Sequence, residues 1–509
     1  MSNIPTITAF YRRIHMNKIG FDNDKYLQMQ SEKILERIDV FGGKLYLEFG
    51  GKLFDDYHAS RVLPGFKPDS KVKMLLQLKD KVEIVIAISA DDIERSKRRG
   101  DYGITYDQDI MRLIDAFREI GLYVGSVVIT CYRPNFATDS FQKHLKSLGI
   151  KVYRHYPIAD YPANIPLIVS EDGYGKNDYI ETTRSLVVVT APGPGSGKMA
   201  TCLSQLYHEH ERRIKAGYAK FETFPIWNLP LKHPVNIAYE AATTDLNDVN
   251  MIDPFHLEAY GITAISYNRD IEIFPVLNTI LDRILEKSPY QSPTDMGVNM
   301  VGFCITDEET VCRAAEQEVI RRYYKTQCAQ KQGLAEKAEV YKLELLMNTL
   351  DISPKCRPVV DAALKRAEAT DGPAAALQLH DGRIVTGKTS SVLGASAALL
   401  LNSLKELGGI NHDMHLISPI VIEPIQTLKL KHMGNSNPRL HTDEILIALS
   451  ICATTNPVAE LAAQQLSKLR GCEAHSTVIL SRVDENVFQK LGINITCEPR
   501  YQSKKLYHK

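Results

Sequence analysis

The stretch Leu186-Val-Val-Val-Thr190, followed directly by Ala191-Pro-Gly-Pro-Gly-Ser-Gly-Lys198, decides the fold of this chain. The run of β-formers predicts a buried strand, and the amphipathic stretch that begins near Met199 predicts a helix. A strand, a glycine-rich loop and a helix in this order form a phosphate cradle, because loop amides and the positive end of the helix dipole converge on one point. The sequence therefore predicts an α/β fold with a P-loop-like anion site.

The glycine loop, Ala191–Lys198, contributes the residues that we expect to bind the anion. Glycine permits a tight backbone that brings several N–H groups together, and Lys198 adds a mobile positive charge. In phosphoryl transfer a protein mainly positions groups and neutralises charge, so Lys198 is also the candidate catalytic residue. The predicted ligand-binding residues of the loop are Gly193, Gly195, Ser196, Gly197 and Lys198.

The loop departs from the usual pattern G-x-x-x-x-G-K-[ST] in ways that bear on mechanism. Pro192 stands where the first glycine belongs, and Met199 stands where a hydroxyl would bind Mg²⁺. Thr201 lies two residues further along the predicted helix and therefore points roughly to the opposite side. We favour phosphate or another anion over ordinary Mg-ATP hydrolysis. The alternative is a Gly/Pro turn that only joins the strand to the helix.

A second segment, Gly382–Thr389, matches the P-loop pattern letter by letter. It nevertheless begins with a predicted hairpin turn and continues as a returning strand at Arg383–Thr386, and an extended segment cannot wrap a phosphate. We rank it below the first loop. Its remaining candidates for cofactor binding are Lys388 and Thr389, which lie in a polar turn before the apolar helix predicted at Val392–Leu407.

Composition and length restrict the class of protein. With 509 residues the chain is too long for one core and predicts about three domains. Its 61 basic and 61 acidic residues balance, so no basic field favours nucleic acid as a partner. The nine cysteines include neither a C-x-x-C pair nor a zinc spacing, which predicts reduced thiols and no zinc.

We expect neither a secretory signal nor a membrane-spanning segment. The residues up to Lys18 are followed by polar Asp22–Lys25 instead of an apolar segment, and no stretch is long and apolar enough to cross a bilayer. The protein is therefore expected to be cytoplasmic and to have no membrane partner. The residues before Met16 are interpreted as a dispensable extension or the product of an alternative start.

Alternating predicted strands and helices divide the chain into three parts. Residues 1–305 follow the rhythm of βαβ units, which predicts a three-layer domain with a parallel sheet and the glycine loop at the carboxyl end of a strand. Residues 306–370 are strongly helical, and their αα-hairpin, Glu308–Tyr324 with Leu334–Leu350, is interpreted as a scaffold or a homo-oligomer contact. Residues 371–509 alternate again and predict a C-terminal α/β domain.

Two carboxylates are candidates for a metal site. A strand predicted at Val235–Ala241 leads into a polar segment that contains Asp245 and Asp248. Acidic residues just past a strand end hold Mg²⁺ in many nucleotide sites, directly or through water. The alternative is a capped helix start with solvated acidic residues, because Asp and Thr are common N-cap residues.

Arg439 is the candidate anion ligand of a polar loop, His432–His441, which concentrates imidazole, amide and guanidinium groups. A guanidinium fork fits phosphate or carboxylate well, and neighbouring asparagines can donate to the same ligand. The alternative is a loop whose polar groups are satisfied by its own Asn side chains.

Seven motifs stand out along the chain: Phe49-Gly-Gly-Lys52, Arg61-Val-Leu-Pro-Gly65, Thr190–Lys198, Tyr218–Pro225, Val249–His256, Thr294–Met300 and Asn437–Glu444. Together they closely resemble the bacterial domain-of-unknown-function family 1846, from about Phe21 to near the end of the chain. The resemblance implies a multi-domain cytosolic α/β protein with a helical insert and a C-terminal three-layer domain likened to deaminase folds. It also implies that the proline-containing glycine loop is the family's own version of the motif.

Several functions agree with these patterns. The first is a nucleotide- or phosphometabolite-dependent enzyme, a phosphotransferase or ligase that uses ATP or another phosphorylated small molecule together with Mg²⁺. The second is a non-catalytic sensor or assembly protein that binds an anion, and the third is transferase chemistry on an unphosphorylated small molecule. The motifs H-E-x-x-H, G-x-S-x-G and that of the zinc deaminases are absent from the sequence, which argues against hydrolase and deaminase chemistry.

Overall fold

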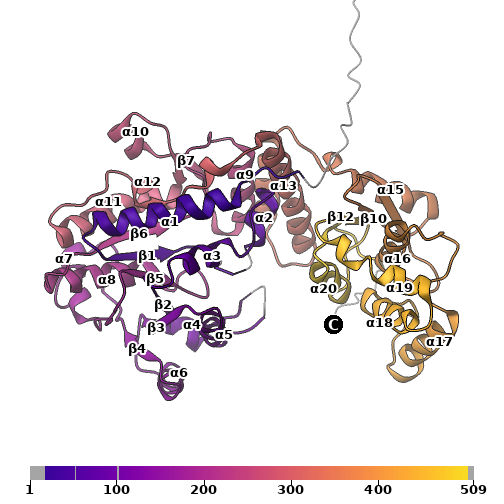
Figure 1. Ribbon diagram of the computed structural model, residues 1–509, viewed down its shortest axis with the longest axis horizontal. Helices are drawn as coiled ribbons and strands as arrows, with labels where there is room; N and C mark the ends of the chain where they lie inside the picture. Colours follow the sequence, from indigo (N-terminus) through magenta and orange to yellow (C-terminus); the bar gives the residue numbers. More distant parts are fainter. Residues whose placement is uncertain (1–17, 52, 55, 100–102, 503–509) are drawn as a thin grey trace, which may run out of the picture. The chain divides into compact units, whose positions relative to one another are not determined.

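The computed structural model describes residues 18–51, 53–54, 56–99 and 103–502 (Figure 1). Residues 1–17, which include the N-terminal extension predicted before Met16, lie outside this part of the chain. Ile19–Ala315 form one compact unit and the chain from Glu316 onward forms a second. Each unit has its own sheet.

The sheet of the first unit is parallel throughout, as the sequence predicts. Its strands lie in the order β4-β3-β2-β5-β1-β6-β9, and every neighbouring pair runs in the same direction. The central strands are continuous apolar runs because helices cover both faces of the sheet. The strands are β1 (Leu45–Phe49), β2 (Val82–Ser89), β3 (Tyr123–Thr130), β4 (Lys151–Arg154), β5 (Leu186–Thr190), β6 (Gly217–Phe221) and β9 (Gly297–Val298).

Helices form a layer on each face of this sheet (Figure 1). On one face α8 (Lys198–Glu211) and α11 (Asn268–Leu285) pack on Val187 and Val189 of β5 in a shared apolar cluster. The connections through α3 (Ser70–Gln77) and α5 (Tyr106–Glu119) run along the sheet in the opposite direction, so the right-handed crossover rule places them on the other face. There α1 (Asn23–Val40) packs on α3. The predicted three layers are therefore confirmed.

The strand order creates a topological switch point between β2 and β5. The chain leaves β2 toward β3 in one direction, and it leaves β5 toward β6 in the other, although β2 and β5 are neighbours. The connections therefore lie on opposite faces of the sheet. In open α/β sheets, ligands bind at the carboxyl ends of two strands related in this way. The glycine loop follows β5 at this point.

The prediction of a strand at Val235–Ala241 is wrong, because this segment forms helix α9 (Pro234–Ala242). Proline at the first helical position and His233 as N-cap residue favour a helix start, and Val235, Ala238 and Ala241 share its buried face. The remaining short elements of the unit are α2 (Tyr57–Val62), α4 (Ala90–Glu94), α6 (Phe136–Ser147), α7 (Ile165–Ile168), α10 (Pro254–Tyr260), α12 (Pro293–Met296) and the antiparallel pair β7 (Asn250–Ile252) with β8 (Ile265–Tyr267).

The second unit contains a four-stranded mixed sheet in the order β11-β10-β12-β13. Helix α15 (Pro358–Thr370) packs on one face through Ala376, whereas α16 (Ala395–Gly408) packs on the other through Ala375 and Leu377. The predicted C-terminal three-layer arrangement is therefore present. The strands are β10 (Ala374–Gln378), β11 (Ile384–Lys388), β12 (Glu473–Ser476) and β13 (Asn494–Cys497).

The helical region predicted for residues 306–370 contains α13 (Glu308–Lys331) and α14 (Lys337–Thr349), with a turn at Gly333. The second unit also contains helices beyond α16 that cover its sheet or lie at its surface. They are α17 (Pro419–Thr427), α18 (Thr442–Ala453), α19 (Pro457–Ala463) and α20 (Arg482–Lys490).

A buried guanidinium holds the second sheet to the segment before α15. Arg357 is 1% exposed, and its Nη2 donates to the carbonyl oxygens of Ala474 (3.0 Å) and Asn494 (2.8 Å). Its Nη1 forms an ion pair with Glu473, to which Arg321 also pairs at 2.8 Å. The buried charges are therefore compensated by direct partners, as a low-dielectric interior requires.

Replacing Arg357 should destabilise the second unit strongly. Arg357→Met removes a charged donor from the carbonyls of Ala474 and Asn494 and the cation that pairs with Glu473, and within the described ranges only the Ala474 carbonyl keeps a side-chain donor, the Thr496 hydroxyl. We expect a loss of about 3–5 kcal/mol in the free energy of unfolding. Arg383→Met is the control, because the Arg383 guanidinium pairs with Asp381 and Glu406 at the surface and should cost less than about 1 kcal/mol. Urea unfolding measures both, and equal losses would contradict the prediction.

Candidate functional site

The glycine loop has the strand, loop and helix geometry that its sequence predicts. Gly195 and Gly197 adopt left-handed φ angles of 77° and 81°, which glycine tolerates better than other residues. Gly197 is the N-cap residue of α8, and no side chain caps the helix there. The first-turn N–H groups of α8 therefore face the carboxyl end of the sheet without a capping side chain.

Two loop glycines are required by close packing. A Cβ atom at Gly193 would lie 2.2 Å from the hydroxyl oxygen of Tyr106, and one at Gly197 would lie 3.0 Å from the Thr130 side chain. The Thr130 hydroxyl donates to the carbonyl oxygen of Ser196 (2.9 Å) and fixes the loop to the end of β3. Ser196 is fully buried, and its hydroxyl donates to the carbonyl oxygen of Gly193 (3.0 Å). The Ser196 side chain therefore stabilises the loop from inside.

The loop retains groups that can bind an anion. Among the described residues, the amides of Gly195, Gly197, Lys198 and Met199 donate no hydrogen bond. The Lys198 ammonium is partly exposed, and it has neither an ion pair nor a hydrogen bond with any residue in the described ranges. Amide donors and a positive charge thus meet at the N-terminus of α8, where the helix dipole also favours negative charge.

The hydroxyl position of a P-loop is unavailable to Mg²⁺ here. Met199 follows Lys198 and packs against the apolar cluster beneath α8. The Thr201 hydroxyl donates to the carbonyl oxygen of Gly197 (2.9 Å) and is buried. The loop therefore offers amides and an ammonium for an anion, but no hydroxyl oxygen for a metal ion.

A buried carboxylate that the sequence analysis did not select lies near the carboxyl end of β1, the strand next to β5. Glu48 is 8% exposed on β1, in register with Val189 near the end of β5, and the Tyr218 hydroxyl donates to its Oε2 (2.8 Å). Burial raises the pKa of the Cys202 thiol, the Glu48 carboxylate raises it further, and the Lys198 ammonium lowers it. Lys198 and Cys202 lie one turn apart on α8 and therefore share one face of this helix.

The next strand continues this polar cluster. Lys220 on β6 is in register with Glu48, and its Nζ lies 2.6 Å from Asp270 Oδ2 and 2.8 Å from Glu222 Oε1. Burial opposes the charge of Lys220, but Asp270 and Glu222 hold its pKa above the usual value. A single charged residue in each apolar strand, Glu48 in β1 and Lys220 in β6, is the signal that could have identified the cluster from sequence.

The predicted metal ligands Asp245 and Asp248 follow helix α9, not a strand, so the reason for choosing them does not hold. Asp245 is exposed in a short 3₁₀ turn, Thr244–Leu246. Asp248 is 2% exposed, and its Oδ1 lies 2.7 Å from Nε of Arg269. The carboxylate of Asp248 is thus engaged with a guanidinium, the kind of partner a buried carboxylate needs.

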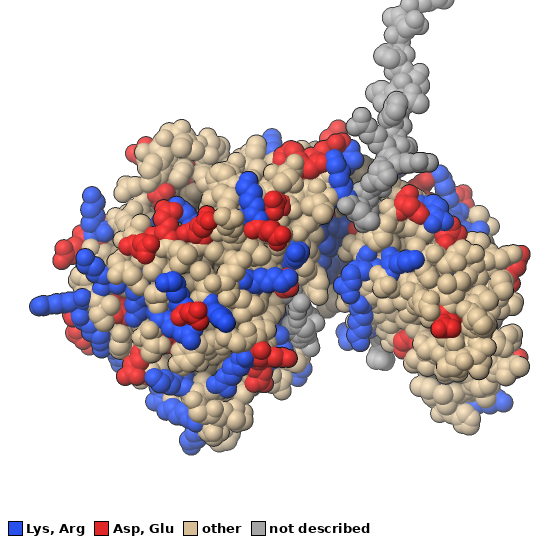
Figure 2. All heavy atoms as spheres, in the orientation of Figure 1, with Lys and Arg blue, Asp and Glu red and all other residues tan. Residues whose placement is uncertain are grey.

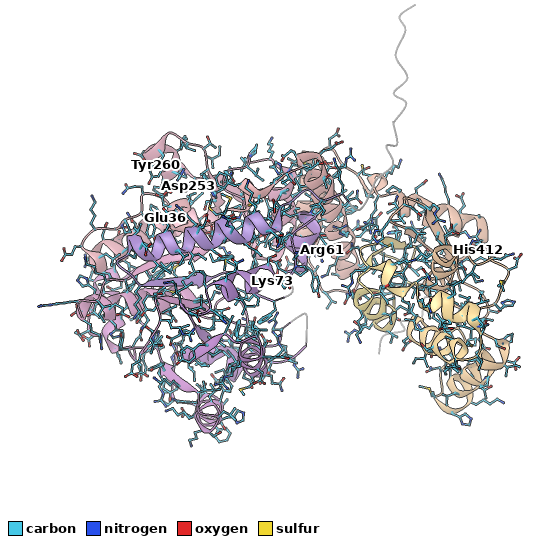
Figure 3. The ribbon with its side chains drawn as sticks, viewed as in Figure 1. Glu36, Arg61, Lys73, Asp253, Tyr260 and His412 are labelled. Atoms are coloured by element: carbon cyan, nitrogen blue, oxygen red, sulfur yellow. The ribbon has the colours of Figure 1, made fainter. Side chains whose placement is uncertain are left out.

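The Val249–His256 motif has a structural role at Asp253, which is fully buried and caps α10 (Figure 3). Its Oδ1 accepts from the amides of Phe255 and His256, and its Oδ2 accepts the hydroxyl of Thr294 at 2.6 Å. All of these contacts are hydrogen bonds within the protein. A capping carboxylate of this kind stabilises the start of a helix.

The segment with the letter-perfect P-loop pattern is a turn and a strand, as the sequence analysis predicts. Lys388 is the exposed last residue of β11. Gly387 packs against α16, where a Cβ would lie 2.3 Å from the amide nitrogen of Leu399. This glycine therefore permits close contact between a strand and a helix.

The structure brings Arg439 to the segment that contains the other two anion candidates of the second unit, Lys388 and Thr389. The Arg439 guanidinium donates from Nε to the carbonyl oxygen of Ser390 (2.7 Å), directly after Lys388 and Thr389. The Thr389 amide donates to the carbonyl oxygen of Pro373 (2.9 Å), and the Arg439 amide donates to Asn437 Oδ1 (3.2 Å). Part of this loop is thus satisfied by its own asparagine, and Arg439 is partly engaged with the backbone.

Charges of both signs are interspersed over the face of the first unit that Figure 2 displays. This distribution agrees with the balanced composition of 61 basic and 61 acidic residues. Within the described ranges, no helix has both the length and the apolar character that crossing a bilayer requires.

Comparisons with known proteins agree with the resemblance seen in the motifs. Residues 19–351 match the N-terminal model of the domain of unknown function DUF1846, and residues 355–507 match its C-terminal model. A UPF0371 protein of Streptococcus pyogenes serotype M28 is 60% identical over 494 residues, which cover 97% of this chain and all of the relative. A UPF0371 protein of Streptococcus equi subsp. equi is 59% identical over 492 residues, with the same coverage of both chains. The chain therefore belongs to the UPF0371 family, which carries the two DUF1846 domains.

Proposed function

We propose that the glycine loop binds the phosphate group of a small molecule at the carboxyl ends of β2 and β5. The observation that supports this most directly is the pairing of uncommitted amides, at Gly195, Gly197 and Lys198, with a Lys198 ammonium that has no partner in the described part of the chain. Partial positive charge at a helix N-terminus and a full positive charge on lysine both favour an anion. The topological switch point supplies the place where a ligand enters.

The binding mode differs from that of an ordinary Mg-ATPase. Met199 and Thr201 leave the loop without a hydroxyl that reaches a metal ion. A nucleotide such as ATP would therefore keep its Mg²⁺ through its own phosphates and water. The phosphate itself would be held by amides and by Lys198, so that affinity for a simple phosphate ligand depends little on Mg²⁺.

We propose a phosphotransferase or ligase as the class of enzyme, with Lys198 neutralising charge on the transferred group. Glu48 supports this assignment because it lies near the same end of the sheet as the loop. Its charge also shifts the pKa of the Cys202 thiol, which the charge of Lys198 shifts in the opposite direction. A buried carboxylate in such a position suits proton transfer from an acceptor group.

A second candidate function is non-catalytic binding of a phosphorylated metabolite. It is favoured by the engagement of Glu48 with the Tyr218 hydroxyl and of Lys220 with Asp270, since these groups already have protein partners. Under this alternative the polar cluster only stabilises the carboxyl ends of β1 and β6.

Removing the ammonium of Lys198 should abolish most ligand binding. Lys198→Ala removes a charge-assisted hydrogen bond, and we expect the Kd for inorganic phosphate or ATP to rise about 10- to 100-fold. The increase in Tm that the ligand produces should shrink accordingly. Lys143→Ala, at an exposed position of α6, is the control and should retain the wild-type shift. An unchanged ligand-induced shift in Lys198→Ala would count against the proposal.

The two left-handed glycines should differ in their tolerance of a methyl group. At Gly195 a Cβ meets nothing within 4 Å, so Gly195→Ala costs only the backbone strain of roughly 1–2 kcal/mol. At Gly197 the same strain is added to a 3.0 Å contact with Thr130, and we expect a larger loss of both stability and phosphate affinity. Calorimetric titration with phosphate compares the variants, and a Gly195→Ala defect as large as that of Gly197→Ala would show that packing on Thr130 does not shape the loop.

Glu48→Gln separates the two candidate functions. If the protein is an enzyme, this variant should retain the ATP-induced thermal shift and lose at least about 100-fold in turnover, because general acid–base catalysis contributes that much. The measurement is mass spectrometry of a metabolite extract after incubation with ATP, Mg²⁺ and either protein. If neither protein alters any metabolite and both bind, non-catalytic binding is the function.

A further inference from the structure

Three potential metal ligands meet where helices α9 and α13 begin. His233 is the N-cap residue of α9, and Glu308 and Cys312 lie on the first two turns of α13. Both helices are labelled in Figure 1. Glu308 and Cys312 are four residues apart and therefore share one face of their helix. All three belong to the Ile19–Ala315 unit and lie outside the glycine loop and the polar cluster of Glu48.

The distances between the ligand atoms suit one metal ion. Each of the three residues offers an atom within 4.8 Å of the other two. Cys312 Sγ lies 3.7 Å from His233 Nε2 and 3.9 Å from Glu308 Oε1. In a tetrahedral zinc site with ordinary bond lengths, neighbouring ligand atoms are roughly 3.3–3.7 Å apart. Both distances to sulfur are therefore close to the required values.

The carboxylate is the ligand that has to move, and it is free to do so. Glu308 Oε1 accepts a hydrogen bond from His233 Nε2. The distance between these two atoms is shorter than the distance between two ligand atoms of one zinc ion. The Glu308 side chain is 61% exposed, whereas that of His233 is only 6% exposed. A rotation of the exposed side chain away from the imidazole would open the position between the three ligand atoms. The exposed side also leaves room for a water molecule as the fourth ligand.

The protonation states of the ligands define how an ion would bind. His233 Nδ1 accepts the amide of Val235 (3.2 Å), so Nε2 carries the proton that it donates to Glu308. On metal binding at Nε2 this proton moves to Nδ1, and one cap hydrogen bond is lost. The Cys312 thiol releases its proton to solvent, because a metal binds the thiolate. Binding of one divalent ion therefore releases one proton and should tighten as the pH rises.

We propose that His233, Glu308 and Cys312 bind one Zn²⁺ ion with water as the fourth ligand. A thiolate and an imidazole select zinc over Mg²⁺ or Ca²⁺, which prefer oxygen ligands. The loss of one cap hydrogen bond is small beside the free energy with which thiolate-containing sites bind zinc. The ion ties the start of α9 to the start of α13, 75 residues away in sequence between His233 and Glu308.

The test uses the full-length protein after removal of metals with a chelator. Titration with Zn²⁺ against a chromophoric chelator should give one high-affinity site per chain, and titration with Co²⁺ should give thiolate-to-cobalt charge-transfer absorption. Cys312→Ala should abolish that absorption and weaken zinc binding at least about 100-fold. Cys356→Ala, which removes an exposed thiol from the other unit, is the matched control and should change neither.

A second variant separates loss of the metal ligand from loss of the folded structure. Cys312→Ser has nearly the same size as the wild type, and circular dichroism of the metal-free protein should show the same helix content for both. Retention of the cobalt–thiolate absorption in Cys312→Ser or Cys312→Ala would overturn the proposal. A wild-type chain that binds no zinc in the titration would overturn it as well.

Discussion

The handedness of the connections between parallel strands controls the arrangement of the first unit. Because a crossover between parallel strands is right-handed, the segments that leave β2 and β5 in opposite directions must lie on opposite faces of the sheet. The carboxyl ends of these neighbouring strands thereby form the topological switch point of the sheet. The glycine loop, the end of β3 at Thr130 and the N-terminus of α8 are brought together by this one constraint.

Buried charge is compensated in both units by direct contacts. Lys220 lies between Asp270 and Glu222 in the first unit, and Arg357 and Arg321 share Glu473 in the second. Such groups are costly to bury unless they are paired, so each pair restricts which elements can pack together. Lys198 in the glycine loop differs from these paired groups. Lys198 has no ion-pair partner in the described ranges, whereas Lys220 on β6 has two, Asp270 and Glu222.

Sequence patterns predicted the parts of the fold that depend on neighbours along the chain. The strand predicted at Leu186–Thr190 is β5, and the parallel sheet, the helical region and the C-terminal three-layer domain are present. The error at Val235–Ala241 arose because its apolar residues fit both a two-residue and a 3.6-residue period. Pro234 and His233 favour the helix, and the contacts of Asn236 with Ile226 stabilise it within the unit.

By itself, the sequence determined the order of strand, glycine loop and helix, the methionine where a P-loop has a hydroxyl, and the family of the chain, because these properties lie in adjacent residues or in motifs that are continuous along the chain. Only the tertiary structure decided which polar groups are engaged. It joined Asp248 to Arg269, placed Thr130 against Gly197, set Glu48 beside Lys220 and brought Cys312 to His233. These pairs are far apart along the chain, and their contact depends on strand order and helix packing, which no local pattern encodes.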